Sequence, residues 1–261
     1  MTGVLVPSGV AKLNYRVSWD ELPEDFPLPD DPVESTAQPL LAAALRESLE
    51  LVGFLTPDKL VASNLGICAT VNKKYVVKAP DWLYVANVLP PDPQQTSRRS
   101  YTPRTQGDIP AIVMEFLSET EGGEYSARPH YPYGKLWFYE RILEVPIYVI
   151  FEPEEGTLEV RQLVNGVYQM QTADDRDRYW LAPLNLYLGI WQGTKADRDG
   201  YWLRFWDENG NLLLWGAEQI EQERQRTEQE RQRAEQERQR AEQLAAYLRS
   251  QGLDPDNLPQ S

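Results

Sequence analysis

The chain is poor in the residues that build two common kinds of active site. Its 261 residues include one cysteine, Cys68, and one histidine, His130. This scarcity excludes a disulfide framework, a zinc cluster of Cys and His ligands, and most nucleophilic catalysis that depends on a histidine base. Cys68 lies among small apolar residues, which predicts a buried strand position, and His130 is expected to be a loop residue rather than a ligand.

Long apolar runs are also missing. No stretch approaches the 18 consecutive apolar residues of a membrane-spanning helix, and the N-terminal segment has no apolar core of the kind found in secretion signals. We therefore expect a cytoplasmic protein without a membrane partner.

Positive charge is in deficit, with 26 Lys and Arg against 40 Asp and Glu and a net charge of −14. The C-terminal stretch Glu218 to Arg249 holds 8 Glu and 7 Arg, so the acidic excess belongs to the rest of the chain. This balance argues against a non-specific nucleic-acid binder, because affinity for phosphate needs clustered cations. Two local groups stay candidates for a basic strip, although solvated loop charges are the simpler interpretation: Lys73, Lys74 and Lys78, and Arg98, Arg99 and Arg104.

The clearest pattern present is a heptad repeat near the C-terminus. Residues 221–248 read EQERQRT, EQERQRA, EQERQRA, EQLAAYL. A seven-residue period predicts one long helix and is typical of coiled coils, but arginine occupies every second seam position before the last heptad. Two alternatives stay open: a solvated charged helix, alone or lying partly on the body, and a weakly self-associating coil.

Charge pairing supports this helix. Three pairs at i,i+4 spacing, each worth roughly 0.2–0.5 kcal/mol, are expected: Arg224–Glu228, Arg226–Glu230 and Arg231–Glu235. The helix should end at Ser250-Gln251-Gly252, where glycine permits a left-handed cap. We thus expect a domain over residues 1–215, a helix and possible coiled coil over 216–250, and a flexible tail over 251–261.

Apolar periodicity in the body predicts an α+β domain on a mixed sheet. The apolar stripe of LLAAALRESLELV, from Leu41 to Val52, predicts an amphipathic helix that starts near Pro39 and ends at Gly53. Short strands are expected within residues 60–88, a long exposed loop over 90–108, buried strands over 111–118 and 145–153, and a short helix over 135–143. Asn165-Gly166 and Asn209-Gly210 each predict a hairpin turn.

Three polar residues interrupt or border these apolar segments. Asp81 precedes the strand WLYVANV, Glu115 lies inside the buried run AIVMEFL, and Lys135 opens the helix before the next buried strand. A carboxylate on a buried strand is costly unless a cation neutralises it. Two carboxylates with a lysine suit a magnesium site for phosphodiester hydrolysis. A buried Glu–Lys pair tied to Asp81 as a purely structural network explains the same pattern.

These segments resemble a known superfamily. APDWLYV, MEFLSE and GKLWFYE followed by VPIYVIFEP are similar, over about residues 15–215, to PD-(D/E)xK nucleases, and among them to a large restriction-endonuclease-like family in which the lysine has moved from the strand position, here Leu117, to the next helix. The resemblance implies a restriction-endonuclease-like core with extra C-terminal hairpins and a charged helix. It implies Asp81 and Glu115 as metal ligands and Lys135 as the catalytic cation, with Tyr139 one turn later.

The resemblance also implies a glutamate from the first helix, because members of this family often add one. Glu47 borders the buried face of that helix and is preferred, whereas Glu50 lines up with Arg46 and faces water. The sequence departs from the family pattern between Glu115 and Lys135, where the segment is longer than usual, and Tyr131 stands where an acid is often found.

The expected function is Mg²⁺- or Mn²⁺-dependent endonuclease cleavage of a nucleic acid, with DNA the expected partner and RNA an open alternative, by a chain that could pair as a homodimer. The alternative is a catalytically silent protein that keeps the nuclease fold for binding and assembles through its C-terminal helix.

Overall fold

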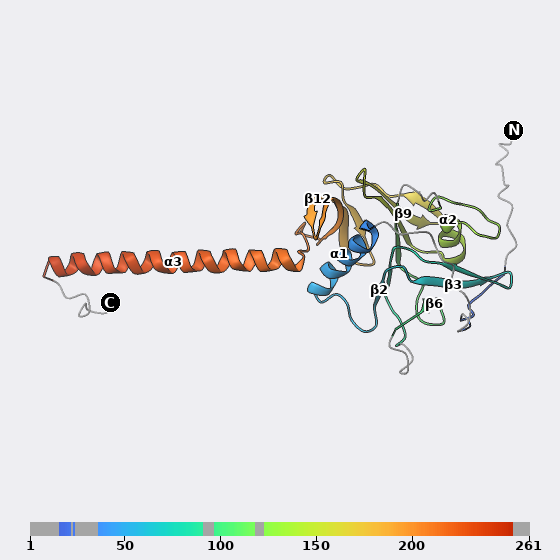
Figure 1. Cartoon of the computed structure of the whole chain (residues 1–261), viewed down its shortest axis with the longest axis horizontal. Helices are drawn as coiled ribbons and strands as arrows, with labels where there is room; N and C mark the ends of the chain where they lie inside the picture. Colours follow the sequence, from blue (N-terminus) through green and yellow to red (C-terminus); the bar gives the residue numbers. More distant parts are fainter. Residues whose placement is uncertain (1–15, 22, 24–35, 91–96, 118–122, 253–261) are drawn as a thin grey trace, which may run out of the picture. The chain divides into compact units, whose positions relative to one another are not determined.

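The computed structural model describes residues 16–21, 23, 36–90, 97–117 and 123–252 (Figure 1). The contacts divide the chain into two units, residues 1–213 and 214–261. The elements in chain order are β1 (Val17–Ser18), α1 (Ala37–Leu51), β2 (Leu60–Ala62), β3 (Gly66–Val71), β4 (Lys74–Lys78), β5 (Trp82–Val85), β6 (Ser100–Tyr101), β7 (Ile112–Phe116), α2 (Lys135–Trp137), the π-helical turn η1 (Phe138–Leu143), β8 (Ile147–Glu152), β9 (Thr157–Val164), β10 (Val167–Met170), β11 (Tyr179–Leu181), β12 (Leu186–Lys195), β13 (Arg198–Trp206) and α3 (Gly216–Ser250).

A six-stranded mixed sheet forms the centre of the first unit. Its strand order is β10-β9-β8-β7-β5-β2. β7 and β8 run parallel, and the other neighbouring pairs are antiparallel. The chain between β7 and β8 forms α2 and η1, which supply the crossover that a parallel pair requires. These features confirm the predicted α+β class and mixed sheet.

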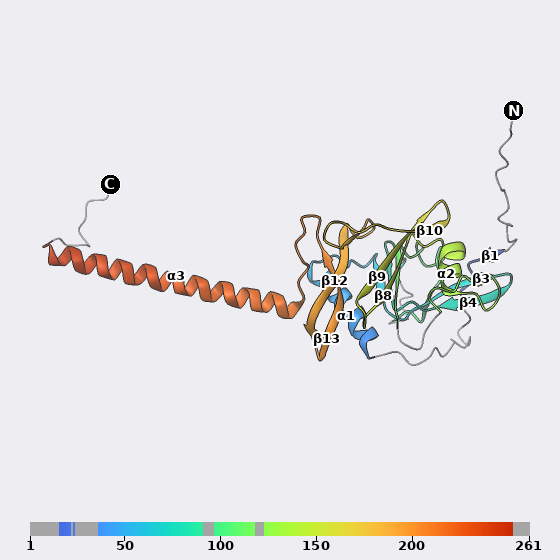
Figure 2. The same cartoon turned by 90° about the horizontal axis from the view of Figure 1, so that it is seen from above.

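Separate layers cover the two faces of this sheet. Both views show α1 and β12 on one side of β9, with α2 and β3 on the other, and Figure 2 shows β13 on the same side as β12 (Figures 1 and 2). On the first face, Trp82 lies 6.5 Å from Phe205 of β13, measured between ring centroids. On the second face, one apolar cluster joins Leu83 and Val113 to the rings of α2 and η1 and to β3 and β4. Side chains alternate between faces along a strand, so neighbouring residues of β7 enter different layers.

Most predicted elements are confirmed. The apolar stripe of α1 is buried as expected, except that Val52 ends the helix and is 53% exposed. The strands β7 and β8 are buried almost throughout, and Asn165-Gly166 forms the β9–β10 turn. Cys68 is buried in β3 and His130 is exposed. Within the described ranges, no helix has the length and apolar character needed to cross a membrane.

The second predicted hairpin is shorter than expected. Asn209-Gly210 lies in a turn, and the pairing across it is an isolated antiparallel bridge between Trp206 and Leu212, flanked by backbone hydrogen bonds from Asp207 N to Asn211 O and from Leu213 N to Phe205 O. The Asp207 side chain accepts backbone hydrogen bonds from Asn209 and Asn211 and closes the turn locally. The long hairpin joins β12 to β13 instead, and its turn places Ala196 at a φ of 51°.

The second unit contains α3, none of whose residues is buried. Gly252 has a φ of +77° directly after the helix, as the predicted C-terminal cap requires. Of the three predicted ion pairs, Arg226–Glu230 forms at 3.2 Å. Arg224 and Arg231 instead form ion pairs with the glutamates three residues earlier in the sequence, Glu221 at 3.6 Å and Glu228 at 3.1 Å.

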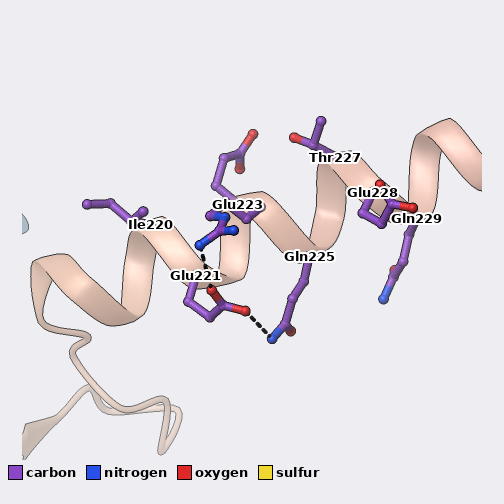
Figure 3. Close-up of a pocket in the computed structure, with 8 residues that line it drawn as sticks. Ile220, Glu221, Glu223, Gln225, Thr227, Glu228 and Gln229 are labelled. Atoms are coloured by element: carbon purple, nitrogen blue, oxygen red, sulfur yellow. Dashed lines mark hydrogen bonds and ion pairs between the residues drawn. The ribbon is translucent and has the colours of Figure 1, made fainter.

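The residues around a hollow near the start of α3 all belong to this helix, and Glu221 there binds both Gln225 and an arginine (Figure 3). Since no other element lines the hollow, we do not treat it as a ligand site. The proposed boundary at residue 215 and the coiled coil stay predictions, and of the predicted tail over 251–261 only Gln251 and Gly252 lie within the described residues.

Deleting residues 218–261 is expected to change the oligomeric state or partner choice and to leave the unfolding midpoint of the body within about 2 °C. The reason is that α3 contributes no buried side chain. Light scattering and thermal unfolding of the full chain and the truncated chain test this. Unfolding of the truncated body would make α3 part of the core.

Candidate active site

Asp81 and Glu115 lie across from each other on neighbouring strands. β5 and β7 pair so that Trp82 opposes Met114 and Leu83 opposes Val113. Continuing this antiparallel register by one residue puts Asp81 opposite Glu115, on the same face of the sheet, where Cβ atoms are about 4.5–5.5 Å apart. The Phe116 amide donates a 2.6 Å hydrogen bond to Asp81 Oδ2, which fixes one carboxylate oxygen at the end of β7.

Glu115 is fully buried, and both of its oxygens have partners. The Tyr139 hydroxyl donates to Oε1 at 2.9 Å, and the Lys135 ammonium donates to Oε2 at 3.2 Å. Burial raises the pKa of the Glu115 carboxyl to about 8; Lys135 opposes this shift and Asp81 adds to it. Burial thus favours the neutral form of this carboxyl, whereas Lys135 favours its charged form.

Lys135 is brought to the carboxylates by the start of α2. Gly134 precedes it in an extended conformation, and a Cβ on Gly134 would lie 2.0 Å from the Ser126 carbonyl oxygen. Glycine is needed at this position because the incoming loop packs directly on the helix start. The Trp137 amide also donates to Ser126 O at 3.3 Å. These contacts carry Lys135 back to the sheet across the long segment after β7.

The electrostatic surroundings of Lys135 keep it charged. Burial opposes its charge, but the carboxylates of Glu115, Glu124 and Asp81 outweigh burial and raise the pKa of the ammonium above its usual value. The side chain is 18% exposed, so it lies between the buried carboxylates and the surface.

Sequence reasoning missed Glu124. It comes from the loop before α2, is 2% exposed, and accepts a 3.3 Å bond from Lys135 through Oε1. The Tyr148 hydroxyl of β8 holds the Glu124 backbone carbonyl at 2.9 Å. No periodic pattern surrounds Glu124, which lies in the loop before α2. Its burial depends on tertiary packing, which the sequence pattern does not report.

The structure does not bring Glu47 to the other predicted site residues. Glu47 forms a 2.6 Å ion pair with Lys195 of β12. The N-terminal end of α1 is the part near the site, since Gln38 donates to the Phe116 carbonyl oxygen at 2.7 Å. Glu47 is about 14 Å further along the helix axis. Because α1 covers the face opposite to the Glu115 side chain, we leave Glu47 out of the site. Glu50 faces solvent and pairs with Arg46 at 2.8 Å, as predicted.

The donor set fits a hard divalent cation. Asp81 and Glu115 present carboxylate oxygens on one face, and a carboxylate oxygen can accept more than one partner. Among the residues that the structure describes, no group of three or more His, Cys, Asp or Glu side chains forms a ready metal cage. Mg²⁺ does not require one, because it commonly binds through one or two carboxylates and keeps several waters.

Comparison with known families decides the broader assignment. Residues 26–195, more than half of the chain, match the family model Uma2, described as "Putative restriction endonuclease". The chain belongs to the Uma2 family. Membership confirms the predicted restriction-endonuclease-like fold and indicates a nuclease-like function. The matched range contains Asp81, Glu115, Glu124 and Lys135. A comparison with curated proteins finds no match.

Proposed function

We propose that this Uma2 protein is a divalent-metal-dependent endonuclease with Asp81 and Glu115 as metal ligands and Lys135 as the catalytic cation. The observation that carries the proposal is the contact of a charged lysine with a buried carboxylate, directly beside a second carboxylate on the next strand. Restriction-endonuclease-like enzymes generally use divalent metal ions, and this acid-rich site with one lysine suits them.

In the proposed reaction, a water oxygen bonds to phosphorus and releases a proton to solvent, while the bond to the leaving oxygen breaks and that oxygen takes up a proton from solvent. A bound Mg²⁺ or Mn²⁺ supplies Lewis-acid polarisation of a phosphoryl oxygen and lowers the pKa of a bound water. Asp81, oriented by the Phe116 amide, and Glu115, oriented by Tyr139, hold the ligand oxygens in place. Lys135 donates hydrogen bonds to the phosphoryl oxygens as negative charge develops on them.

An exposed aromatic and cationic contact in the loop that leads to Lys135 supports a nucleic-acid substrate, which we take to be DNA. Tyr131, in the loop that leads to Lys135, is 54% exposed, and the Lys74 ammonium lies 4.6 Å from its ring centroid. Tyr133 packs edge-on against Tyr131. Exposed aromatic rings next to cations are typical of surfaces that contact bases and phosphates. Such a local surface reconciles a nucleic-acid substrate with the acidic net charge.

Asp81→Ala is expected to reduce cleavage by at least about 10³-fold, because the loss of a charged metal ligand removes several kcal/mol of transition-state stabilisation. The measurement is cleavage of a panel of supercoiled DNA, single-stranded DNA and structured RNA with Mg²⁺, with Mn²⁺ and with a chelator. The matched control is Asp197→Ala in the β12–β13 turn, where the side chain is exposed. The control variant should cleave like the wild type.

Cleavage that survives Asp81→Ala would refute the site. Binding of a substrate without cleavage by the wild-type protein under every metal condition would instead support the alternative of a catalytically silent nuclease-fold protein.

A further inference from the structure

Two carboxylates contact a single lysine at the site, and Asp81 is the third carboxylate that acts on it electrostatically. Lys135 donates to Glu115 at 3.2 Å and to Glu124 at 3.3 Å, and Asp81 lies close enough to act on the charge of both Lys135 and Glu115. Both bonds are longer than the 2.7–2.9 Å or so typical of charge-assisted hydrogen bonds. The ammonium is therefore held between two carboxylates rather than drawn fully to either one.

Lysine needs such restraint for a positional role, because four rotatable bonds separate its ammonium from the backbone. Glu115 contacts the ammonium from the sheet, and Glu124 contacts it from the loop before α2. One carboxylate fixes a distance, whereas two carboxylates from different elements also fix a direction. Of the two carboxylates that contact the Lys135 ammonium, only Glu115 would remain without Glu124, and Glu115 also accepts a hydrogen bond from Tyr139.

The surroundings of Glu124 argue against a purely structural role. The side chain is 2% exposed, yet its Oε2 has no hydrogen-bond partner among the residues that the structure describes. A buried acceptor without a donor is destabilising, and native structures rarely keep one without a reason. The loop does not need this carboxylate for anchoring, since the Tyr148 hydroxyl already binds the Glu124 carbonyl.

We propose that Glu124 is a positioning residue, which holds the Lys135 ammonium beside Glu115 in the orientation that the reaction requires. The catalytic consequence rests on the function proposed above, whereas the restraint of Lys135 does not depend on it. The unpaired Oε2 is also an acceptor that could orient a water molecule.

Two measurements on the full chain test the proposal. The first is kcat and KM for the cleaved substrate at saturating Mg²⁺, where Glu124→Ala is expected to lower kcat about 10–100-fold, as supporting residues of metal sites do, with KM within about threefold. Glu124→Gln keeps an oxygen acceptor and the side-chain volume, so its kcat should fall between the wild type and Glu124→Ala. A merely structural carboxylate would lower the unfolding midpoint and leave kcat of the folded protein unchanged.

The second measurement is independent of activity. The NMR order parameter of the Lys135 Cε methylene, recorded with a chelator present, should fall below about 0.6 in Glu124→Ala while the wild type stays ordered. Tyr125→Phe is the matched control, because it removes the 3.2 Å hydrogen bond of the neighbouring loop residue to Glu159 but keeps the Glu124 carboxylate and its backbone anchor; Lys135 should stay ordered in it.

The outcomes separate the two proposals. A folded Glu124→Ala variant with wild-type kcat, or with Lys135 as ordered as in the wild type, would overturn the role of Glu124. If the alanine variant does not fold, the glutamine variant carries the same comparison. If the wild type cleaves no substrate, the proposed function fails while the order parameters still decide the restraint.

Discussion

Lys135→Met is expected to lower the free energy of unfolding by roughly 3–5 kcal/mol and to reduce cleavage below detection. The cost arises because Lys135 is the cation that pairs with the almost completely buried Glu124 carboxylate, next to the buried Glu115 carboxyl. Removal of one partner from a buried ion pair leaves a buried charge uncompensated, which is far more costly than loss of a surface pair. Methionine preserves much of the aliphatic volume, so the change reports mainly on charge.

The chain offers a matched control in Lys195→Met. The Lys195–Glu47 pair is shorter, at 2.6 Å, but the glutamate side chain is 35% exposed, so its loss should cost about 0–1 kcal/mol. Urea denaturation of both variants at pH 7.5 in a chelating buffer measures the difference. Equal costs for the two variants would show that burial does not set the strength of the Lys135 pair.

Local patterns predicted the parts of the fold that depend on one segment at a time. The continuous apolar run of β7 and the turn signal Asn165-Gly166 are both confirmed. The β12–β13 hairpin was missed because its turn places an alanine, Ala196, at a positive φ, where Gly or Asn would have signalled it. The first strand of this hairpin, β12, also contains Gly189 and Gly193, and glycines weaken the sequence pattern of a strand.

The site was predictable to the extent that its residues break an apolar pattern. Glu115 and Asp81 stand out in or next to buried strands, but only strand register shows that they face each other. Glu124 breaks no pattern, and its approach to Lys135 depends on loop packing at Gly134. The bordering position of Glu47 on α1 is correct, yet the helix lies on the other face of the sheet. Periodicity gives the buried side of an element but not the layer that it covers.

Glu115→Gln is expected to separate stability from activity. Burial raises the pKa of Glu115 to about 8 in the folded protein, compared with 4.5 for an unperturbed glutamate. The folded state thus favours the protonated form, which the amide imitates in shape and charge. At pH 5 the wild-type and Gln variants should have free energies of unfolding within about 1 kcal/mol of each other, as expected for one neutral hydrogen-bonding group replaced by another.

The sign of the pH dependence follows from the raised pKa. Below about pH 4.5 Glu115 is protonated in both the folded and the unfolded protein, so the stability that its raised pKa provides is fully present. Between pH 4.5 and 8 the unfolded chain releases a proton that the folded protein keeps, so stability falls as pH rises, by at most about 1.4 kcal/mol per pH unit. Glutamine does not titrate, so the Glu115→Gln variant does not lose stability in this way as pH rises. With a chelator present, it should therefore be the more stable protein at pH 8.

Cleavage should change in the opposite direction, because glutamine cannot supply the negative charge of a metal ligand. We expect a loss of at least about 10³-fold, which corresponds to several kcal/mol of transition-state stabilisation. Denaturation curves from pH 5 to 8 and cleavage rates with Mg²⁺ measure both properties, and Glu154→Gln, an exposed carboxylate after β8, is the control. A variant that is more stable and inactive would mean that Glu115 is retained for its reactivity at a cost in stability. A Gln variant that cleaves like the wild type would leave Glu115 as a structural partner of Lys135.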